Sequence, residues 1–385
     1  AETAVSDLKQ GGTLRLSVTA LGPNFNLFGT GVTSYTQAAL SPMYYSGLWQ
    51  ANPMGKRTLS TDFAKSFEIA EENGLPVVSI ELNPQAKFND GTPIDYKALQ
   101  ATWNILKSVD GDYKIETSGI YSSVGSVERD GDDFKVKVTF AEPYYPLNIL
   151  FGEILHPALL DKNLFNEGFV DKPHPEYWVG PFTIAEGGWN STEKTLTLTR
   201  NEKWWGTKPA LERIPWREMS SQAEQAAYKN GEIDYVDAST LSSYNELSGV
   251  ANTDIRKGSA LSVGNYEINP EKVPLPVRRA FVAALNREQL QKLRYEKLGW
   301  KEKLPGSMCM LPMQEGYQDN YPTKLGKDVA TKILEDAGYT KNGDYYAKDG
   351  AKVSYPVITF GSDPVVSSTA QFLVQQMKEI GVELT

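Results

Sequence analysis

Residues 88–106 read FNDGTPIDYKALQATWNIL and combine a turn, a helix cap and an amphipathic helix. An Asp-Gly pair at 90–91 is typical of a tight turn. Asp95 is placed as an N-cap, because its carboxylate can accept hydrogen bonds from the free N–H groups of a first helical turn. Three apolar residues then follow at helical spacing and predict one buried stripe: Leu99, Trp103 and Leu106.

Other segments add strands and helices on both sides of this stretch. Strand patterns occur in five places: 13–18, 77–82, 195–199, 233–236 and 263–268. Residues 124–140 predict a hairpin that turns at Asp130-Gly131. Helices are predicted at 222–230, 277–285 and 329–337. A strand at 355–360, a helix at 366–380 and the final VELT form a βαβ pattern, so the chain is predicted to build α/β lobes.

Length and charge exclude several classes of protein. A chain of 385 residues is too long for one compact core, so two or three domains are expected. The net charge of −9 carries no long basic run, which argues against a nucleic-acid or anionic-membrane partner. The most apolar stretch, 147–160, contains Glu153, His156 and Pro157, and it predicts no membrane span.

Common catalytic and cofactor motifs are absent from the sequence. There is no glycine-rich nucleotide motif, zinc-protease motif, nucleophile elbow or CxxC pair, and no cofactor is expected. The two histidines, His156 and His174, each have a nearby proline, which favours local loop roles over a shared metal site. Cys309 has no histidine near it in sequence and is expected to be a buried, inert thiol. This pattern favours a binding protein over an enzyme.

Seven segments together resemble one family. They are, in order, GGTLRLSV, FNDGTPIDYKALQATWNIL, VGPFTIAE, TLTLTRNEKWWGTKPALERI, AAYKNGEIDYVD, PLPVRRAFVAALNREQL and LGKDVATKILEDAGY. The chain resembles the large extracytoplasmic solute-binding proteins of peptide-type ABC transporters, the dipeptide- and oligopeptide-binding group. It departs from the family in a second tryptophan within EKWWGTKPAL and in Asn286, where aspartate is common.

The resemblance implies a two-lobed periplasmic-binding-protein-like fold of type II, in the large class with an extra subdomain. Residues 1–49 and 178–262 would form the core of lobe I, 50–177 its extra subdomain, and 263–385 lobe II, with a hinge near 260–270. Family members normally continue past the segment similar to MKEIGVELT. The chain is therefore expected to be a fragment with an incomplete second lobe and weakened ligand binding, and the acidic residue that receives a peptide amino terminus is expected beyond residue 385.

The resemblance also places a ligand between the lobes, held extended by backbone hydrogen bonds. The first-lobe wall would be the loop 31–35, for which a simple flexible loop is the alternative. Tyrosines offer apolar area with a polar tip, and methionines adapt to varied side chains, although core roles remain open for them. The residues expected to contact ligand are Gly31, Val32, Thr33, Ser34, Tyr35, Tyr121, Tyr144, Asn269, Trp300, Met308 and Met310. The stretch 88–106 is interpreted as scaffold.

The predicted function is that of an extracytoplasmic receptor, secreted or lipid-anchored, that delivers an oligopeptide or similar small solute to the membrane subunits of an ABC permease. It is expected to be a monomer that binds no nucleic acid. Within this class an oligosaccharide, an opine or a metal chelate is the alternative ligand. An exported hydrolase and a surface adhesion or chaperone-like role are the alternatives from other classes.

Overall fold

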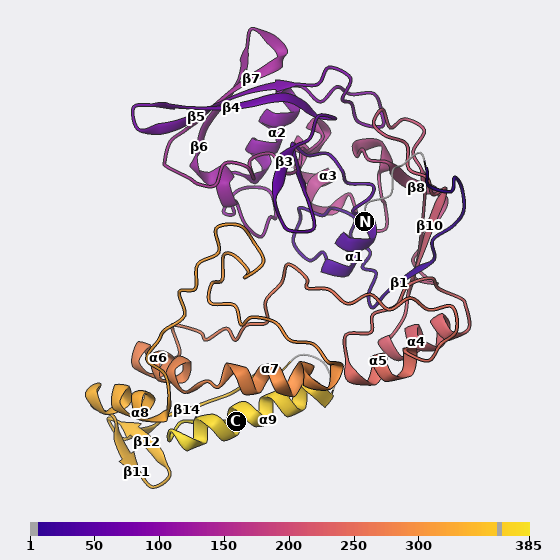
Figure 1. Ribbon diagram of the computed structural model, residues 1–385. Coiled ribbons are helices and arrows are strands. Elements are labelled where there is room, and N and C mark those ends of the chain that lie inside the picture. The colour runs from indigo at the N-terminus through magenta and orange to yellow at the C-terminus, as the bar shows by residue number, and fades with distance from the viewer. Residues whose placement is uncertain (1–6, 360–363) are drawn as a thin grey trace. The chain divides into compact units, whose positions relative to one another are not determined.

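The computed structural model describes residues 7–359 and 364–385. The chain divides into two compact units, residues 1–237 and 238–385, drawn in Figure 1 from indigo to yellow. Over the described part of the chain, no helix has the length and apolar character needed to cross a membrane.

Unit 1 contains two four-stranded sheets. The first has the strand order β1–β10–β9–β8, in which β1 runs parallel to β10 and the other pairs are antiparallel. Its strands are β1 (Leu16–Val18), β8 (Phe182–Asn190), β9 (Thr195–Arg200) and β10 (Arg213–Glu218). The predicted strand at 195–199 is confirmed in this sheet. The strand predicted at 13–18 is shorter, since β1 begins at Leu16 and Thr13 forms only an isolated bridge to Arg213.

The second sheet is antiparallel throughout, with the order β4–β5–β7–β6. Its strands are β4 (Ala64–Glu72), β5 (Leu75–Leu82), β6 (Val124–Asp130) and β7 (Asp132–Phe140), and a separate pair is formed by β2 (Trp49–Ala51) and β3 (Arg57–Leu59). Helix α2 (Tyr96–Leu106) packs against β6 and β7 (Figure 1). The predicted strand at 77–82 and the hairpin at 124–140 are confirmed.

The stretch 88–106 folds as its sequence predicts. The Asp95 carboxylate accepts a hydrogen bond from the backbone N–H of Lys97 at 2.8 Å and caps α2. Leu99 and Leu106 are buried, while Trp103 is half-buried under the ammonium group of Lys107. The stripe therefore joins the helix to the large core of unit 1.

The remaining helices of unit 1 are short. They are α1 (Ser34–Leu40), α3 (Lys162–Glu167), α4 (Ser221–Lys229) and the 3-10 turns η2 (Gly119–Ser123), η3 (Pro157–Leu160) and η4 (Pro175–Tyr177). The predicted helix at 222–230 is confirmed as α4, and Gly231 follows it with a φ of 71° that favours glycine.

The prediction of a strand at 233–236 is wrong. Asp234 lies beside Arg15, and its backbone N–H donates to the Arg15 carbonyl at 2.9 Å. The N–H of Arg15, however, donates to the Asp234 carboxylate at 2.7 Å, and the guanidinium group binds the same carboxylate. A side chain thus takes the place of the backbone carbonyl that a strand ladder would need.

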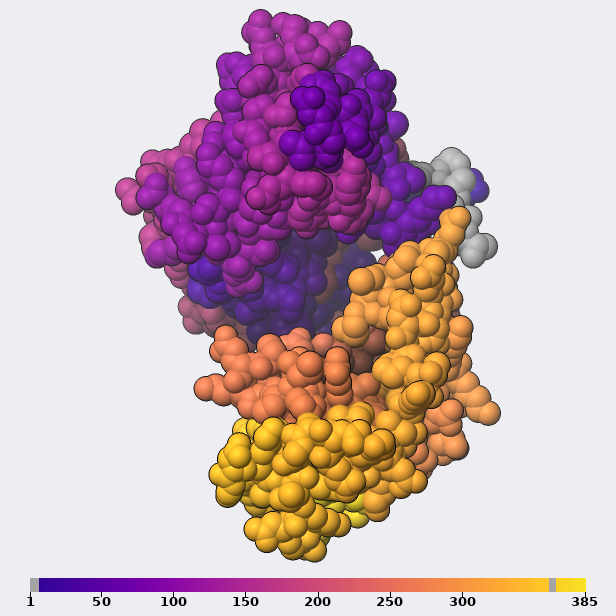
Figure 2. All heavy atoms as spheres, turned by 90° about the vertical axis from the view of Figure 1, so that its left-hand side faces the viewer, coloured from indigo at the N-terminus to yellow at the C-terminus, as the bar shows by residue number. Residues whose placement is uncertain are grey.

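Unit 2 has its own, smaller core. Its elements are α5 (Leu241–Leu247), α6 (Leu275–Ala284), α7 (Arg287–Tyr295), η5 (Glu296–Leu298), α8 (Lys327–Asp336), β11 (Thr340–Asn342), β12 (Tyr345–Lys348), β13 (Ala351–Lys352), β14 (Ser354–Tyr355), α9 (Pro364–Glu379) and β15 (Glu383–Leu384). Val277, Leu334 and Met377 bring α6, α8 and α9 together in that core. In the space-filling view, the yellow C-terminal residues form one packed body (Figure 2).

Three predictions for unit 2 need correction. Residues 263–268 form no strand, because within the described residues none of them has a backbone hydrogen bond to a neighbouring strand. The predicted strand at 355–360 is shorter: β14 spans two residues that pair in parallel with β15, and residue 360 lies outside the described residues. Cys309 is exposed rather than buried, since it lies in a turn-rich segment outside the core.

Candidate functional site

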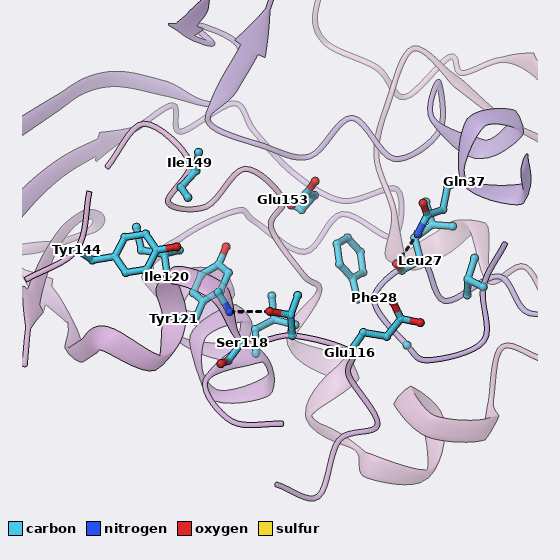
Figure 3. A pocket seen from close by; sticks show the side chains of 15 residues that line it. Leu27, Phe28, Gln37, Glu116, Ser118, Ile120, Tyr121, Tyr144, Ile149 and Glu153 are labelled. Atoms are coloured by element: carbon cyan, nitrogen blue, oxygen red, sulfur yellow. Dashed lines mark hydrogen bonds between the residues drawn. The ribbon is translucent and has the colours of Figure 1, made fainter. Parts of the chain in front are cut away.

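A cavity of about 360 Å³ opens within unit 1 (Figure 3). We call it the hollow. Three segments and the end of α2 line it: residues 27–37, 116–121 and 144–153, with Leu106. Its volume lies at the lower end of the range for ligand pockets.

Polar contacts, one of them fully buried, hold the first of these segments. The Asn26 carboxamide donates to the carbonyl of Phe165 at 2.6 Å and accepts from the N–H of Phe28 at 3.2 Å. The Thr33 hydroxyl accepts from the N–H of Thr36 at 3.1 Å and caps α1. These contacts fix the wall that carries Phe28 and the start of α1 at the hollow.

The second segment carries Tyr121 on the turn η2. The N–H of Tyr121 donates to the carbonyl of Ser118 at 3.0 Å, and its ring packs against Phe151 at 5.8 Å between ring centroids. Burial raises the pKa of the Tyr121 phenol well above its usual value, and the neighbouring Glu153 carboxylate adds to the rise. The phenol therefore remains a neutral hydrogen-bonding group at the edge of the hollow.

The third segment places Glu153 next to a close backbone crossing. A Cβ added to Gly47 would lie 1.9 Å from the carbonyl oxygen of Gly152. Two backbone hydrogen bonds flank the crossing, from Ile154 N to Ser46 O at 2.6 Å and from Leu48 N to Phe151 O at 2.9 Å. Partial loss of solvation in the concave wall raises the pKa of the Glu153 carboxyl, and Arg57 opposes this rise. Because the Glu153 surface still meets solvent, the penalty is smaller than that of a carboxylate sealed in a core.

The five predicted residues of the first wall do not all face the hollow. Val32 lines it, whereas Gly31 is exposed with a φ of 81°. The expected loop ends earlier than predicted, because Thr33 caps α1 and both Ser34 and Tyr35 belong to the helix. The Tyr35 side chain is 48% exposed. Their contact with ligand stays a prediction.

The structure brings the predicted Tyr121 and Tyr144 to the same hollow as Val32. Tyr121 is buried and Tyr144 half-buried. The other four predicted residues belong to unit 2: Asn269 and Met308 are exposed, and Trp300 and Met310 are half-buried. Their roles, like the proposed lobe boundaries, stay predictions.

Several residues of the hollow were not predicted from the sequence, among them Phe28, Gln37, Glu116 and Glu153. One signal for Glu153 was present, since it is a lone carboxylate within the apolar stretch 147–160. Such a residue needs solvent or a partner, and its place at the hollow satisfies that need. The others carry no comparable signal in the sequence.

A family model described as "Bacterial extracellular solute-binding proteins, family 5 Middle" matches residues 58–385. The chain belongs to this family. The family resemblance predicted from the sequence motifs is therefore confirmed. The description of the family as solute-binding agrees with the sequence pattern, which favours a binding protein.

Relatives and solved structures extend the likeness. The oligopeptide-binding protein OppA of Mycobacterium tuberculosis strain H37Rv is 27% identical over 386 residues, which cover 98% of this chain and 64% of the relative. The chain thus spans less than two thirds of that protein's length.

Two solved structures show the fold. Periplasmic EDTA-binding protein EppA has a TM-score of 0.77 at 21% identity, and Bacillus subtilis AppA, in complex with a nonapeptide, has a TM-score of 0.74 at 24% identity. Each comparison covers 98% of this chain and 74% of the solved chain. The predicted α/β, two-lobed periplasmic-binding-protein-like fold is confirmed.

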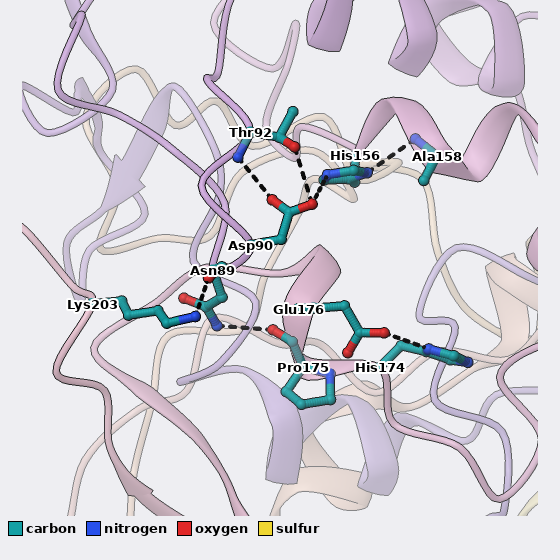
Figure 4. Close-up of polar contacts among 9 residues, drawn as sticks. All are labelled: Asn89, Asp90, Thr92, His156, Ala158, His174, Pro175, Glu176 and Lys203. Atoms are coloured by element: carbon teal, nitrogen blue, oxygen red, sulfur yellow. Dashed lines mark hydrogen bonds and ion pairs between the residues drawn. The ribbon is translucent and has the colours of Figure 1, made fainter.

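In this member of the family, the turn at 88–92 is bound to a buried histidine (Figure 4). His156 is 5% exposed, and its Nδ1 accepts from the N–H of Ala158 at 2.9 Å. Nε2 therefore carries the proton and donates to the Asp90 carboxylate at 3.1 Å, which also accepts from the N–H of Thr92 at 2.8 Å. His156 is a structural link, in agreement with the predicted local loop role.

A second cluster of polar contacts in the same view holds Asn89, the residue that precedes Asp90. The Asn89 carboxamide donates to the carbonyl of Pro175 at 2.9 Å and accepts from Asn201 at 2.9 Å. The Lys203 ammonium group donates to the Asn89 carbonyl, and His174 Nδ1 lies 2.8 Å from a Glu176 oxygen (Figure 4). The turn 88–92 is thus fixed on both sides, which supports its interpretation as scaffold.

We expect the unfolding free energy to fall as the pH drops from 7 through about 6.5, the pKa of an unfolded histidine. Burial lowers the pKa of His156, although the carboxylates of Asp90 and Glu176 oppose this. His156 stays neutral in the folded state there, whereas the unfolded state takes up a proton. The contribution of His156 to stability is therefore complete above pH 6.5 and is lost as the pH falls towards the folded pKa.

Urea unfolding at a series of pH values measures this slope. His156→Asn keeps an acceptor for the cap but does not titrate, so its slope between pH 7 and the folded pKa should be shallower. A slope equal to that of the unmodified protein would contradict the assignment. The Asp90 carboxyl takes up its proton only at lower pH. Burial alone would raise its pKa, but hydrogen bonds from Thr92 and the attraction of His156 lower it.

Proposed function

We propose that this chain captures an oligopeptide as the extracytoplasmic receptor of an ABC importer. The observation that carries the proposal is the alignment of 98% of the chain with an oligopeptide-binding protein at 27% identity. The hollow adds support, because Val32, Tyr121 and Tyr144, expected at a peptide-binding wall, line it together.

In this proposal the peptide lies extended, and its backbone provides most of the hydrogen bonds, so many side chains are tolerated. The closed arrangement of the two lobes is favoured only when both contact ligand. The ligand then passes to the membrane subunits of a permease, and the receptor acts as a monomer, secreted or lipid-anchored. The wall residues Gly31, Thr33, Ser34 and Tyr35 belong to the proposed site.

A metal chelate is the second candidate ligand, since the EDTA-binding protein shares the fold with a TM-score of 0.77. The charge of the hollow favours the peptide. A metal–EDTA complex is anionic, and the hollow is lined by two glutamates without a lysine or arginine to attract it.

Capture from a peptide mixture tests the proposal. The protein is incubated with a tryptic digest of casein, separated from free peptides, and denatured to release what it retained. Mass spectrometry should find a subset of the peptides with unchanged masses. Retention of no peptide would contradict the receptor role, and shortened products would indicate a hydrolase.

Val32→Trp should weaken the binding of a captured peptide by at least about tenfold, because the indole fills space at the wall. Calorimetry with a synthetic copy of that peptide measures the change. Val109→Trp is the matched control, since Val109 is exposed and does not line the hollow. This variant should bind the peptide with the affinity of the unmodified protein. Thr33→Trp is a poorer test, because it also removes the cap of α1. Equal affinities for Val32→Trp and the unmodified protein would remove this wall from the site.

A further inference from the structure

The hollow has an unbalanced charge. Of the residues that line it, Glu116 and Glu153 are acidic, and none is lysine, arginine or histidine. Within residues 7–359 and 364–385, neither carboxylate forms a hydrogen bond or an ion pair with another residue. Arg57 acts on Glu153 only from outside the lining.

Aromatic side chains line the hollow together with the two carboxylates. Figure 3 shows the Phe28 ring between Glu153 and Glu116, with Tyr121 and Tyr144 on the other side of Glu153. Aromatic faces attract cations, and the attraction grows as the cation loses water. Carboxylates attract the same groups through charge-assisted hydrogen bonds.

We propose that the hollow receives an alkylammonium or guanidinium group of the bound peptide, with Glu153 and Glu116 as its charge partners and Phe28 as an aromatic contact. This inference rests on the proposed function for the peptide, but the site itself is built from one unit of the chain. The group comes from a lysine or arginine side chain or from the peptide amino terminus.

The state of Glu153 without ligand fits this role. Its carboxylate has lost part of its solvation in the concave wall, which raises its pKa. A cation placed in the hollow would stabilise the charged form of Glu153 and lower the pKa of its carboxyl. The Tyr121 phenol stays neutral, and its oxygen already interacts with the backbone of Phe151, so it serves as an aromatic wall rather than as a charge partner.

The test uses pentapeptides of alanine in which one lysine moves through all five positions. Each has a counterpart with norleucine at that position, which keeps the carbon chain and lacks the charge. Every peptide is measured by calorimetry with a free and with an acetylated amino terminus, so that side chain and terminus are distinguished. Agmatine, a small guanidinium compound without a peptide backbone, is titrated separately.

For at least one position, the lysine peptide should bind about tenfold more tightly than its norleucine counterpart, or the free terminus about tenfold more tightly than the acetylated one. Glu153→Gln should remove most of that preference and Glu116→Gln part of it. Glu186→Gln, an exposed carboxylate on β8 away from the hollow, should keep it.

Peptides that bind with no preference for positive charge, or a preference that survives Glu153→Gln, would overturn the inference and leave the proposed function standing. If no peptide binds, the proposed function fails and agmatine decides the inference. Agmatine binding that is lost in Glu153→Gln supports the hollow as a cation site in its own right, and no agmatine binding overturns it.

Discussion

Gly47→Ala is expected to destabilise unit 1 by about 3 kcal/mol, the upper part of the usual range for overpacking a dense site. The new methyl group would lie 1.9 Å from the carbonyl oxygen of Gly152, which is backbone and has no flexible end to move. The two strandlike segments would separate, and the hydrogen bonds that flank the crossing would lengthen. Since Glu153 follows Gly152, the wall of the hollow would shift with them.

Urea unfolding followed by tryptophan fluorescence measures this effect. Trp300 is the only one of the eight tryptophans outside residues 1–237, so the signal reports mainly on unit 1. Gly22→Ala is the matched control, because its added Cβ would meet only the Thr36 hydroxyl at an ordinary 3.6 Å. Equal stability of Gly47→Ala and Gly22→Ala would contradict the close crossing.

Trp178→Ala should cost about 3–5 kcal/mol, the range for removing a large buried aromatic side chain. Trp178 is fully buried, and its ring lies 4.1 Å from that of Tyr44, 5.5 Å from Phe169 and 6.1 Å from Phe28, between centroids. Its loss would leave a cavity behind Phe28, so ligand affinity should fall together with stability.

Trp178→Phe separates packing from polarity at the same position. The Trp178 Nε1 is buried without a hydrogen-bond partner among the described residues, so phenylalanine removes that unpaired donor as well as some volume. It should cost clearly less than alanine in the same urea experiment. A loss in Trp178→Phe as large as that in Trp178→Ala would contradict this expectation.

Local features of the fold could be predicted from the sequence alone. The cap at Asp95, the buried stripe of α2 and the turn at 130–131 depend on residues within a few positions of one another. Periodicity also located α6 and α8, because one face of each helix is buried. The family followed from the order of such motifs.

Features that depend on distant residues could not be predicted. The pattern of 233–236 suits a strand, but the side chain of Asp234 binds Arg15 instead, at the far end of unit 1 in sequence. Thr33 is a local capping signal, but the surrounding glycines and serines favour a loop, so the sequence does not predict that α1 begins at Ser34. The approach of Phe28, Tyr121 and Glu153 in one hollow arises from tertiary packing and has no local signature.

Native mass spectrometry of freshly purified protein shows whether this chain captures a peptide. No ligand is added, and the mass of the intact protein is compared before and after the release of bound molecules under mild activation. We expect a population heavier than the bare chain, which releases peptides whose sequences can be read by fragmentation. A single population at the mass of the bare chain, with no peptide bound after incubation with the casein digest either, would contradict peptide capture.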